Sequence, residues 1–318
     1  MKIAVGVNAD EKTLAAWRAA SPGVEFVATT NTEDRKAAIA DADAYIGRMP
    51  REVFVAHGAR LRWVHSDGAG IEGLAAIPEL AESDVIVTNT RGSHATTISE
   101  HTIGMLLVMT RRFADTSEDQ KAHVWKRPGL AASQRELAGS TMVIVGVGNL
   151  GRAIAKRAAA FEIRVLGVDL FPGAVPEGME AVWPLDRLDD ALAQADVVVI
   201  ALPETPQTRG LFDAGRIGKM KPGGYLLLIS RGGIVDEAAL IAALEAGHLA
   251  GAGLDVTVQE PLPEDSPLWD APHLVLTPHC SGHSRQTTQR VWDTATENIR
   301  RFVRGEELMN VCDKRAGF

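Results

Sequence analysis

The sequence predicts an α/β protein of two domains, each built on a parallel sheet, with one domain inserted into the other. Three observations lead to this. The chain has 318 residues, which is longer than one ordinary domain. Short apolar runs alternate with charged, helix-like stretches, as in parallel sheets with helical crossovers. A glycine-rich turn, "TMVIVGVGNLG" from Thr141 to Gly151, opens a second such series in mid-chain.

The first series occupies residues 1 to about 98. Its predicted strands are "KIAVGV", "VEFVATT", "DAYIGR", "LRWVHSDG" and "VIVTNT", and its predicted helices are "DEKTLAAWRAA", "EDRKAAIAD" and "VFVAHGA". The segment "TTISEHTIGMLLVMTRRFADT" then predicts one long helix, with a Thr or Ser before Glu100 as its capping residue.

The second series begins at Thr141. Its predicted strands are "MVIVGV", "IRVLGVD", "DVVVIAL", "GYLLLIS", "GAGLDV" and "LVLTPH", and the helical "TTQRVWDTATENIRRFVRGE" follows them. Because chain ends are often neighbours, we expect this last helix to pack on the first domain. We therefore assign residues 1–98 plus 287–318 to one domain and residues 99–286 to the inserted domain.

Composition excludes several classes of function. The net charge is −8 and no block of Lys or Arg occurs, which argues against nucleic-acid binding as the main activity. No apolar run approaches the roughly 20 residues that span a bilayer, so no membrane partner is expected. Cys280 and Cys312 make no disulfide framework and suit a reducing compartment, which predicts a cytoplasmic protein.

The glycine turn has the spacing of a dinucleotide-binding loop. Gly146 permits the bend from strand to helix, Gly148 lets a pyrophosphate approach the backbone, and Gly151 lets helix and strand pack closely. The helix that follows offers free N–H groups and a positive dipole end to the phosphates. Because the turn follows an apolar strand, it predicts a Rossmann-like nucleotide domain.

Asp169 closes the next predicted strand, "RVLGVD". A carboxylate there can accept hydrogen bonds from an adenosine ribose, and it repels the 2′-phosphate of NADP. The following "LFPG" supplies no Arg for that phosphate. The position predicts NAD(H) over NADP(H), although a solvated carboxylate at a strand end would give the same pattern.

Hydride transfer to a ketone needs an acid for the new alkoxide and a cation that polarises the carbonyl. Arg231, Glu260 and His279 follow three strands of the second series and are candidates for these roles. Taken alone, His279 would by default be interpreted as a packed core imidazole, and only its company with Arg231 and Glu260 favours a catalytic role. The pattern His279-Cys280-x-x-His283 has no second cluster to complete a zinc site, so no metal is predicted.

At these motifs the sequence resembles the D-isomer-specific 2-hydroxyacid dehydrogenase family. The resemblance covers nearly the whole chain and rests on "ELAGSTMVIVGVGNLGRAIA", "ADVVVIALPETPQTRGLFD", "MKPGGYLLLISRGGIVDEAAL", "AGLDVTVQEPLPEDSPLW" and "LVLTPH". It implies two Rossmann-like or flavodoxin-like domains, with the nucleotide domain inserted into the substrate domain. It also implies NAD-dependent reduction of small 2-keto acids such as glyoxylate, hydroxypyruvate or pyruvate-like compounds.

The resemblance implies a role for each candidate. His279 would be the general acid in reduction and the base in oxidation, and Glu260 would hydrogen-bond and orient its imidazole. Arg231 would bind the substrate carboxylate and keto oxygen, and backbone N–H groups of Ala69 and Gly70, in the family's "GAG" loop, would bind that carboxylate too.

The implied cofactor contacts follow the nucleotide from its phosphates to its nicotinamide. They are Asn149 and Leu150 at the pyrophosphate; Leu202, Pro203 and Thr208 on the adenosine side; and Ile229, Ser230 and Asp255 at the nicotinamide, with Asp255 taking the carboxamide. For each of these, ordinary packing at a strand end is the competing interpretation.

Three further expectations concern substrate and partners. Arg48 closes the strand "YIGR" and is a candidate for the polar end of a substrate, with an ordinary surface charge as the alternative. A homodimer through the nucleotide domain is expected. The alternatives to a 2-keto acid reductase are an NAD-sensing corepressor on the same fold and a 3-phosphoglycerate dehydrogenase. The latter is disfavoured because the first domain has no Arg and Lys cluster and no regulatory domain follows.

Overall fold

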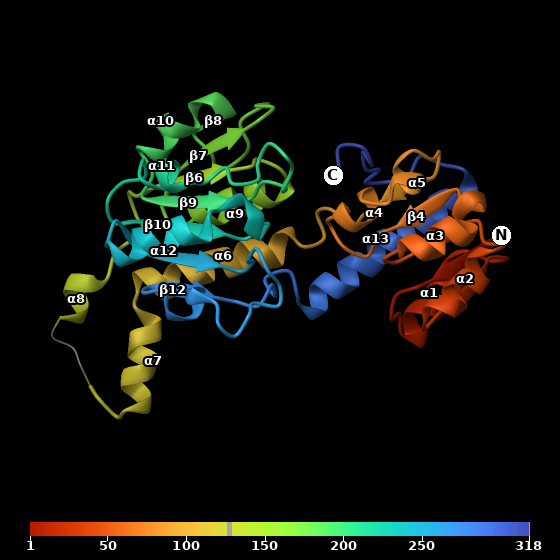
Figure 1. The fold of residues 1–318 in the computed structure, drawn as a ribbon, viewed down its shortest axis with the longest axis horizontal. Helices are drawn as coiled ribbons and strands as arrows, with labels where there is room; N and C mark the ends of the chain where they lie inside the picture. Colours follow the sequence, from red (N-terminus) through yellow and green to blue (C-terminus); the bar gives the residue numbers. More distant parts are fainter. Residues whose placement is uncertain (126–128, 318) are drawn as a thin grey trace. The chain divides into compact units, whose positions relative to one another are not determined.

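The computed structural model describes residues 1–125 and 129–317, and it divides into two compact units (Figure 1). Unit 1 comprises Met1–His94 and Ser284–Phe318, and unit 2 comprises Ala95–His283. Each unit has one sheet, and every strand pair within both sheets is parallel. The predicted α/β class with parallel sheets is confirmed.

Unit 1 has a five-stranded sheet in the order β2-β1-β3-β4-β5. Its strands are β1 (Lys2–Val5), β2 (Glu25–Ala28), β3 (Ala44–Ile46), β4 (Trp63–His65) and β5 (Ile86–Thr88). Its helices are α1 (Glu11–Ala20), α2 (Thr32–Ile39), α3 (Arg51–His57), η1 (Gly58–Arg60), α4 (Glu72–Ala75), α5 (Pro78–Ala81) and α13 (Arg285–Arg304).

Helix α13 joins the end of the chain to unit 1. Its apolar face, which includes Ile299 and Phe302, packs in one core with Trp17 of α1 and Trp63 of β4. The Trp17 indole N–H also donates to Thr296 Oγ1 at 3.0 Å. A separate core on the other side of the strands gathers side chains of α2, α3 and α5, so both faces of this sheet are covered.

Unit 2 has a seven-stranded sheet in the order β12-β11-β10-β9-β6-β7-β8. Its strands are β6 (Thr141–Val145), β7 (Arg164–Asp169), β8 (Ala181–Pro184), β9 (Val197–Ile200), β10 (Gly224–Leu228), β11 (Leu249–Leu254) and β12 (Leu274–Leu276). Its α-helices are α6 (Ala95–Thr110), α7 (Phe113–Lys121), α8 (Leu130–Ser133), α9 (Asn149–Ala159), α10 (Leu188–Leu192), α11 (Ala214–Ile217) and α12 (Glu237–Glu245). Its 3-10 helices are η2 (Leu185–Arg187), η3 (Gly232–Ile234) and η4 (Pro267–Asp270).

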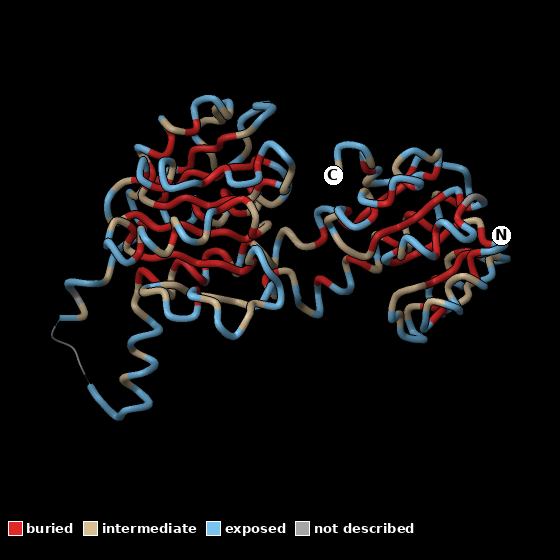
Figure 2. Tube along the Cα trace, in the orientation of Figure 1, coloured by how far each residue is buried: buried red, intermediate tan, exposed pale blue. Residues whose placement is uncertain are grey.

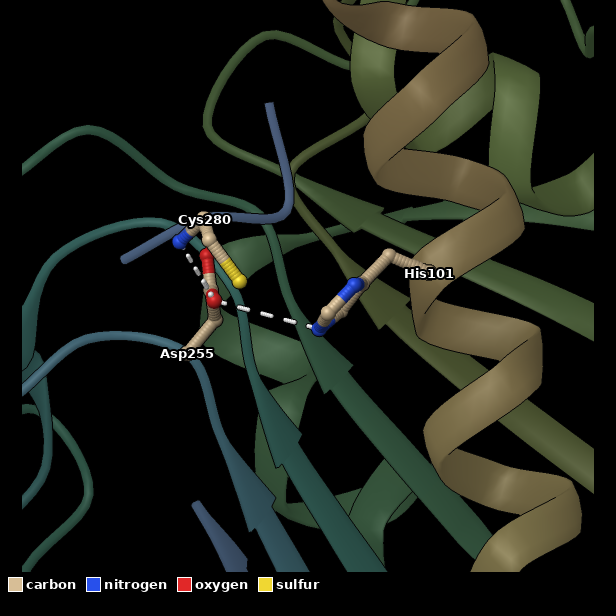
Figure 3. A group of neighbouring side chains, drawn as sticks. All are labelled: His101, Asp255 and Cys280. Atoms are coloured by element: carbon tan, nitrogen blue, oxygen red, sulfur yellow. Dashed lines mark hydrogen bonds and ion pairs between the residues drawn. The ribbon is translucent and has the colours of Figure 1, made fainter. Parts of the chain in front are cut away.

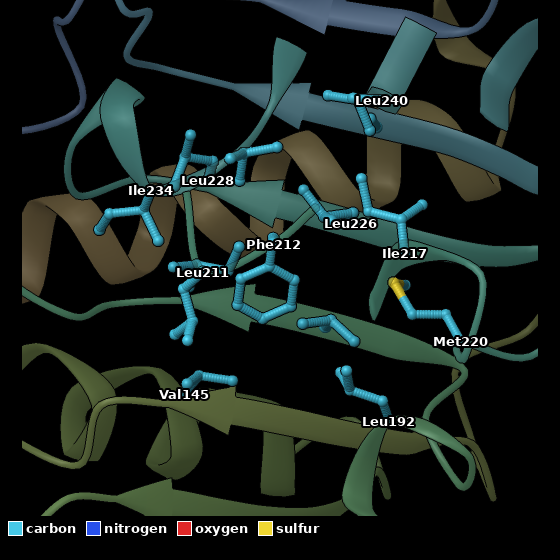
Figure 4. Close-up of a cluster of buried hydrophobic side chains, with 14 of the residues drawn as sticks. Val145, Leu192, Leu211, Phe212, Ile217, Met220, Leu226, Leu228, Ile234 and Leu240 are labelled. Atoms are coloured by element: carbon cyan, nitrogen blue, oxygen red, sulfur yellow. The ribbon is translucent and has the colours of Figure 1, made fainter. Parts of the chain in front are cut away.

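The strands at the centre of the unit 2 sheet are buried along their whole length (Figure 2). On one face, Phe212, Leu226 and Leu228 belong to a core that includes side chains of α10, α11 and α12 (Figure 4). On the other face, α6 and α9 pack over the sheet through residues such as Leu106 and Ile154. Continuous apolar strands are the expected sequence pattern for a parallel sheet covered on both faces.

The prediction of one long helix after residue 95 is wrong. Helix α6 ends at Thr110, and α7 begins at Phe113 after Arg112, whose φ of 57° is left-handed. The Thr110 carbonyl accepts from the Arg135 N–H at 2.9 Å instead of continuing the helix. Ser99 does not cap the helix either, because its hydroxyl donates to the Ala95 carbonyl inside the first turns.

Strand β8 was not anticipated. It is a short edge strand, Ala181–Pro184, that pairs with β7 and ends in a proline, so its sequence carries little periodicity. In the parts of the chain that the structure describes, no helix combines the length and apolarity needed to cross a membrane.

Candidate active site

The glycine turn joins β6 to α9, and its three glycines meet different constraints. Gly146 has a φ of 104°, and a Cβ built on it would lie 2.8 Å from the Ala201 carbonyl carbon. A Cβ on Gly151 would lie 2.1 Å from the Gly146 carbonyl oxygen. Gly148, the N-cap of α9, has no such neighbour within 4 Å. The fold therefore requires Gly146 and Gly151, whereas Gly148 borders open space at a helix N-terminus.

Asp169 ends β7 beside this turn. Its Oδ2 accepts from the Val147 N–H at 2.7 Å, and its Oδ1 accepts from the Phe171 N–H at 2.9 Å. The carboxylate thus holds the backbone of the glycine turn at Val147 and the backbone after β7 at Phe171. Each carboxylate oxygen can still accept a further hydrogen bond, so the residue suits a ribose diol.

The other phosphate-side and adenosine-side candidates lie at the ends of α9 and β9. Asn149 is exposed and Leu150 is partly buried at the start of α9. Leu202 and Thr208 are buried in and after the turn that follows β9, whereas Pro203 is exposed. The Thr208 hydroxyl donates to the Pro203 carbonyl at 2.7 Å, so this side chain holds the loop in shape.

At the end of β10, Ile229 is buried and Ser230 is partly buried. Ser230 Oγ is a buried hydroxyl oxygen that has no hydrogen-bond partner among the described residues. An unsatisfied hydroxyl usually marks a place that water or a ligand completes. The Arg231 guanidinium, also partly buried, donates to the Ser230 carbonyl at 2.7 Å. The unsatisfied Ser230 hydroxyl, the open N-terminus of α9 and the Asp169 carboxylate all offer polar groups that fit a dinucleotide.

His279 and Glu260 are joined by a hydrogen bond. The imidazole Nδ1 lies 2.7 Å from Glu260 Oε2, and the other carboxylate oxygen accepts from the Thr257 N–H at 3.1 Å. Because a carboxylate only accepts hydrogen bonds, Nδ1 carries the shared proton and Nε2 is the nitrogen left for proton transfer. The His279 side chain is 48% exposed, so that nitrogen can reach a substrate.

Asp255 is almost completely buried at the end of β11 and holds the loop that carries His279. Its Oδ1 accepts from the Thr277 hydroxyl at 2.6 Å and from the N–H groups of Cys280 and Ser281 at 3.0 and 3.2 Å. Its carbonyl accepts from the His279 N–H at 2.8 Å. These bonds fix the backbone on each side of His279, whose own φ of 48° is left-handed.

The remaining substrate candidates lie in unit 1. Ala69 is exposed and Gly70 is partly buried in the loop after β4, and the Ala69 carbonyl accepts from the Asn89 side-chain amide. The Gly68 carbonyl, in the same loop, accepts from the Thr90 N–H at 3.1 Å. Arg48 follows β3, and its side chain is exposed. All the catalytic and cofactor candidates belong to unit 2.

Sequence reasoning missed a side-chain cluster around Cys280. The residues that join it are His101 of α6 and Asp255, not the neighbouring His279 and His283 (Figure 3). No local spacing signals this, because the three residues come from separate elements. Burial, and then the Asp255 charge, raise the pKa of the Cys280 thiol, so it is protonated near neutral pH and is a weak nucleophile.

Comparison with known proteins identifies relatives of this chain. The family model described as D-isomer specific 2-hydroxyacid dehydrogenase, NAD binding domain, matches residues 103–281. The D-3-phosphoglycerate dehydrogenase of Mycobacterium leprae is 34% identical over 276 residues, which are 85% of this chain but 51% of that protein. The chain therefore spans about half the length of this curated relative.

Two further relatives are matched over a larger share of their length. The glyoxylate reductase of Thermofilum pendens is 34% identical over 232 residues, 72% of this chain and 68% of that protein. The crystal structure of an NADPH-dependent glyoxylate/hydroxypyruvate reductase from Sinorhizobium meliloti, in complex with NADP and sulfate, superimposes with a TM-score of 0.85. It is 28% identical and covers 100% of this chain and 99% of that one.

Proposed function

Because this chain belongs to the D-isomer-specific 2-hydroxyacid dehydrogenase family, we propose that it is a nicotinamide-dependent oxidoreductase that reduces small 2-keto acids to D-2-hydroxy acids. The observation that carries the proposal is the His279–Glu260 pair, 2.7 Å apart, in the same unit as the glycine turn. A partly exposed imidazole with one nitrogen fixed by a carboxylate is the arrangement that general acid–base catalysis uses.

The proposed residues divide the chemistry between them. Arg231 binds the substrate carboxylate and polarises the keto oxygen. His279 gives its Nε2 proton to the oxygen that becomes the hydroxyl, and Glu260 stabilises the imidazolium before that transfer and holds the ring in place. The nicotinamide, when bound, supplies the hydride to the carbonyl carbon. In the oxidative direction His279 takes the hydroxyl proton back.

For the cofactor, we propose NAD(H) rather than NADP(H). The observation in support is Asp169, a carboxylate at the end of β7 tied to the glycine turn, where it repels a 2′-phosphate. The S. meliloti relative is NADPH-dependent, so family membership alone does not decide between the two. Steady-state kinetics with NADH and NADPH in parallel test the proposal. We expect the higher kcat/KM with NADH, and equal or better efficiency with NADPH would overturn it.

For the substrate, we propose glyoxylate, hydroxypyruvate or a pyruvate-like 2-keto acid, whose carboxylate Arg231 binds. The T. pendens relative, a glyoxylate reductase, supports this class. The M. leprae relative supports 3-phosphoglycerate as a second candidate, oxidised at its 2-hydroxyl. A panel of 2-keto acids with NADH, run beside 3-phosphoglycerate with NAD⁺, separates them. Turnover with no member of the panel would contradict the proposal and favour a corepressor-like role as an NAD-binding protein.

We also propose that two copies of the chain pair through unit 2. In support, Phe113 at the start of α7 is 52% exposed and Trp125 is 95% exposed. Large apolar side chains exposed in one segment commonly mark a protein interface. The oligomeric state of the protein in solution tests this proposal.

A further inference from the structure

Three side chains of different ligand chemistry meet at the carboxyl ends of β11 and β12 (Figure 3). They are His101 from α6, Asp255 after β11 and Cys280 after β12, and one ligand atom of each lies within 4.8 Å of the other two. Imidazole nitrogen, carboxylate oxygen and thiolate sulfur are the three kinds of donor that zinc takes in proteins. The reaction proposed above uses neither His101 nor Cys280.

The charge of Asp255 supports a cation at this place. Its side chain is fully buried, and His101 Nε2, 3.8 Å from Oδ1, is its ion-pair partner among the described residues. Four hydrogen bonds reach the carboxylate, three on Oδ1 and one, from the Ser281 N–H, on Oδ2. Oδ2 thus keeps accepting capacity. A buried carboxylate without a fully charged partner is costly, and a divalent cation would offset that cost.

Metal binding at this place would require the ligand atoms to approach one another and the Thr277 hydroxyl to move. Bonds of about 2.0–2.3 Å to a tetrahedral zinc put ligand atoms roughly 3.4–3.7 Å apart. The 3.8 Å between His101 and Asp255 is close to this value, and the 4.8 Å limit for the whole group leaves about 1 Å to close. His101 and Cys280 are only partly buried and can rotate. Thr277 Oγ1 bridges the two side chains, 3.0 Å from His101 Nε2 and 2.6 Å from Asp255 Oδ1, so this hydroxyl would have to rotate away to admit the metal.

We propose that His101, Asp255 and Cys280 form a three-ligand site for Zn²⁺, with water in the fourth position. Binding replaces the thiol proton by a zinc–sulfur bond and releases that proton to solvent. Three protein ligands leave one position of the ion open to water or another ligand. The site lies at the strand end that carries Asp255, which is the proposed partner of the nicotinamide carboxamide. Zinc and NAD(H) should therefore compete, a consequence that rests on the proposed function.

Cobalt substitution tests the site without any activity measurement. Co²⁺ added to protein that has been stripped with EDTA should give d–d bands of tetrahedral cobalt and a thiolate-to-cobalt charge-transfer band in the near ultraviolet. We expect Zn²⁺ to abolish these bands by displacement. Cys280→Ser should remove the charge-transfer band, and His101→Asn should weaken Co²⁺ binding roughly tenfold or more.

Two variants serve as matched controls. Cys312→Ser removes the other thiol, which lies in unit 1. His283→Asn removes an imidazole that is closer to Cys280 in the sequence than His101 but is not part of the cluster. Both should leave the bands unchanged, and circular dichroism checks that every variant is folded. Absence of a charge-transfer band in the wild type, its persistence in Cys280→Ser, or its loss in His283→Asn with retention in His101→Asn would overturn the proposal.

Adding NAD⁺ to the cobalt-loaded protein tests the metal site separately from the proposed function. Addition of NAD⁺ should reduce the cobalt bands if both occupy the Asp255 region. Cobalt bands that NAD⁺ does not change would keep the metal site and overturn only its link to the cofactor. Failure of the cobalt experiment, in turn, leaves the assignment of His279 and Glu260 unaffected.

Discussion

Two histidines show how the surroundings of one side chain decide its chemistry. His279 is half exposed and its Nδ1 lies 2.7 Å from the Glu260 carboxylate, so its imidazole is held in place and can still reach a substrate. His65, in β4, is completely buried between strands, and its Nδ1 lies 2.8 Å from the Thr88 hydroxyl. Burial lowers the pKa of His65 to about 4, so it stays neutral and structural at neutral pH.

The lowered pKa of His65 makes a prediction for stability. An unfolded imidazole, with a pKa of about 6.5, binds a proton that the folded state refuses, so the free energy of unfolding falls as pH drops below about 6.5. Between pH 7.5 and 5 we expect a loss of about 2 kcal/mol from this residue. Denaturant unfolding of the wild type and His65→Gln at both pH values measures it. Equal losses in the two proteins would show that His65 does not contribute.

Asp169 carries a prediction for cofactor choice. Asp169→Asn keeps an oxygen that can accept from the Val147 N–H but removes the negative charge that repels a 2′-phosphate. The ratio of kcat/KM for NADH to that for NADPH should fall roughly ten- to hundredfold, because hydrogen bonds to charged groups are worth about 1.5–3 kcal/mol. The same ratio in variant and wild type would place the discrimination elsewhere.

The sequence predicted these residues unequally, for a physical reason. Glu260 and His279 follow strands whose carboxyl ends lie at one edge of a parallel sheet, so their proximity could be inferred. His101 faces Asp255 and Cys280 from a helix, and its rotation about the helix axis depends on how α6 packs over the sheet. No pattern in the sequence encodes that rotation.

In the turn between β6 and α9, one glycine is required by the packing of the fold, whereas another borders space that a ligand can occupy. A Cβ on Gly151 would clash with the Gly146 carbonyl oxygen, so the close packing of α9 on β6 depends on the missing Cβ. Gly148 has a φ of −73°, which any residue can adopt, and free space beside it. Neither the backbone conformation nor the packing of the protein therefore requires glycine at position 148.

Alanine at these two positions should give opposite results. Gly151→Ala should lower the free energy of unfolding by about 2–3 kcal/mol or more, because backbone atoms would have to move. Gly148→Ala should change stability by no more than about 0.5 kcal/mol. It should still weaken NADH binding roughly tenfold, because its methyl group occupies the space of the pyrophosphate. Unfolding curves and NADH fluorescence titrations measure both, and unchanged NADH affinity in Gly148→Ala would contradict the assignment.

The break between α6 and α7 marks the limit of periodicity as a guide to elements. The residues around Arg112 continue a helical pattern, yet Arg112 is left-handed, and its guanidinium pairs with Asp115 at 2.5 Å. The Thr110 carbonyl is taken by the N–H of Arg135, a residue after α8. A contact distant in sequence therefore satisfies the last carbonyl of α6, and local propensity could not reveal it.

At the scale of the whole molecule, the two units have separate cores, and the chain crosses between them near residues 94 and 283. The alternation of strands and helices was enough to predict two parallel sheets. The short edge strand β8 escaped because four residues ending in proline carry no clear period.

The proposed dimer makes a prediction at this scale. Trp125→Glu places a charge in the exposed apolar segment of unit 2, and we expect it to convert a dimer into a monomer in size-exclusion chromatography with light scattering. Phe171→Glu is the control, because Phe171 is 79% exposed in the same unit but follows β7. A monomeric wild type, or a dimer that survives Trp125→Glu, would contradict pairing through this segment.

We propose that His279, held by Glu260, is the proton donor of a nicotinamide-dependent dehydrogenase. The most direct test of this proposal is His279→Ala beside wild type and a His283→Asn control, with turnover of the best 2-keto acid and NADH affinity both measured. We predict a loss of roughly a hundred- to ten-thousandfold in kcat for His279→Ala alone, with NADH affinity unchanged. Retained turnover in His279→Ala, or an equal loss in His283→Asn, would contradict the account.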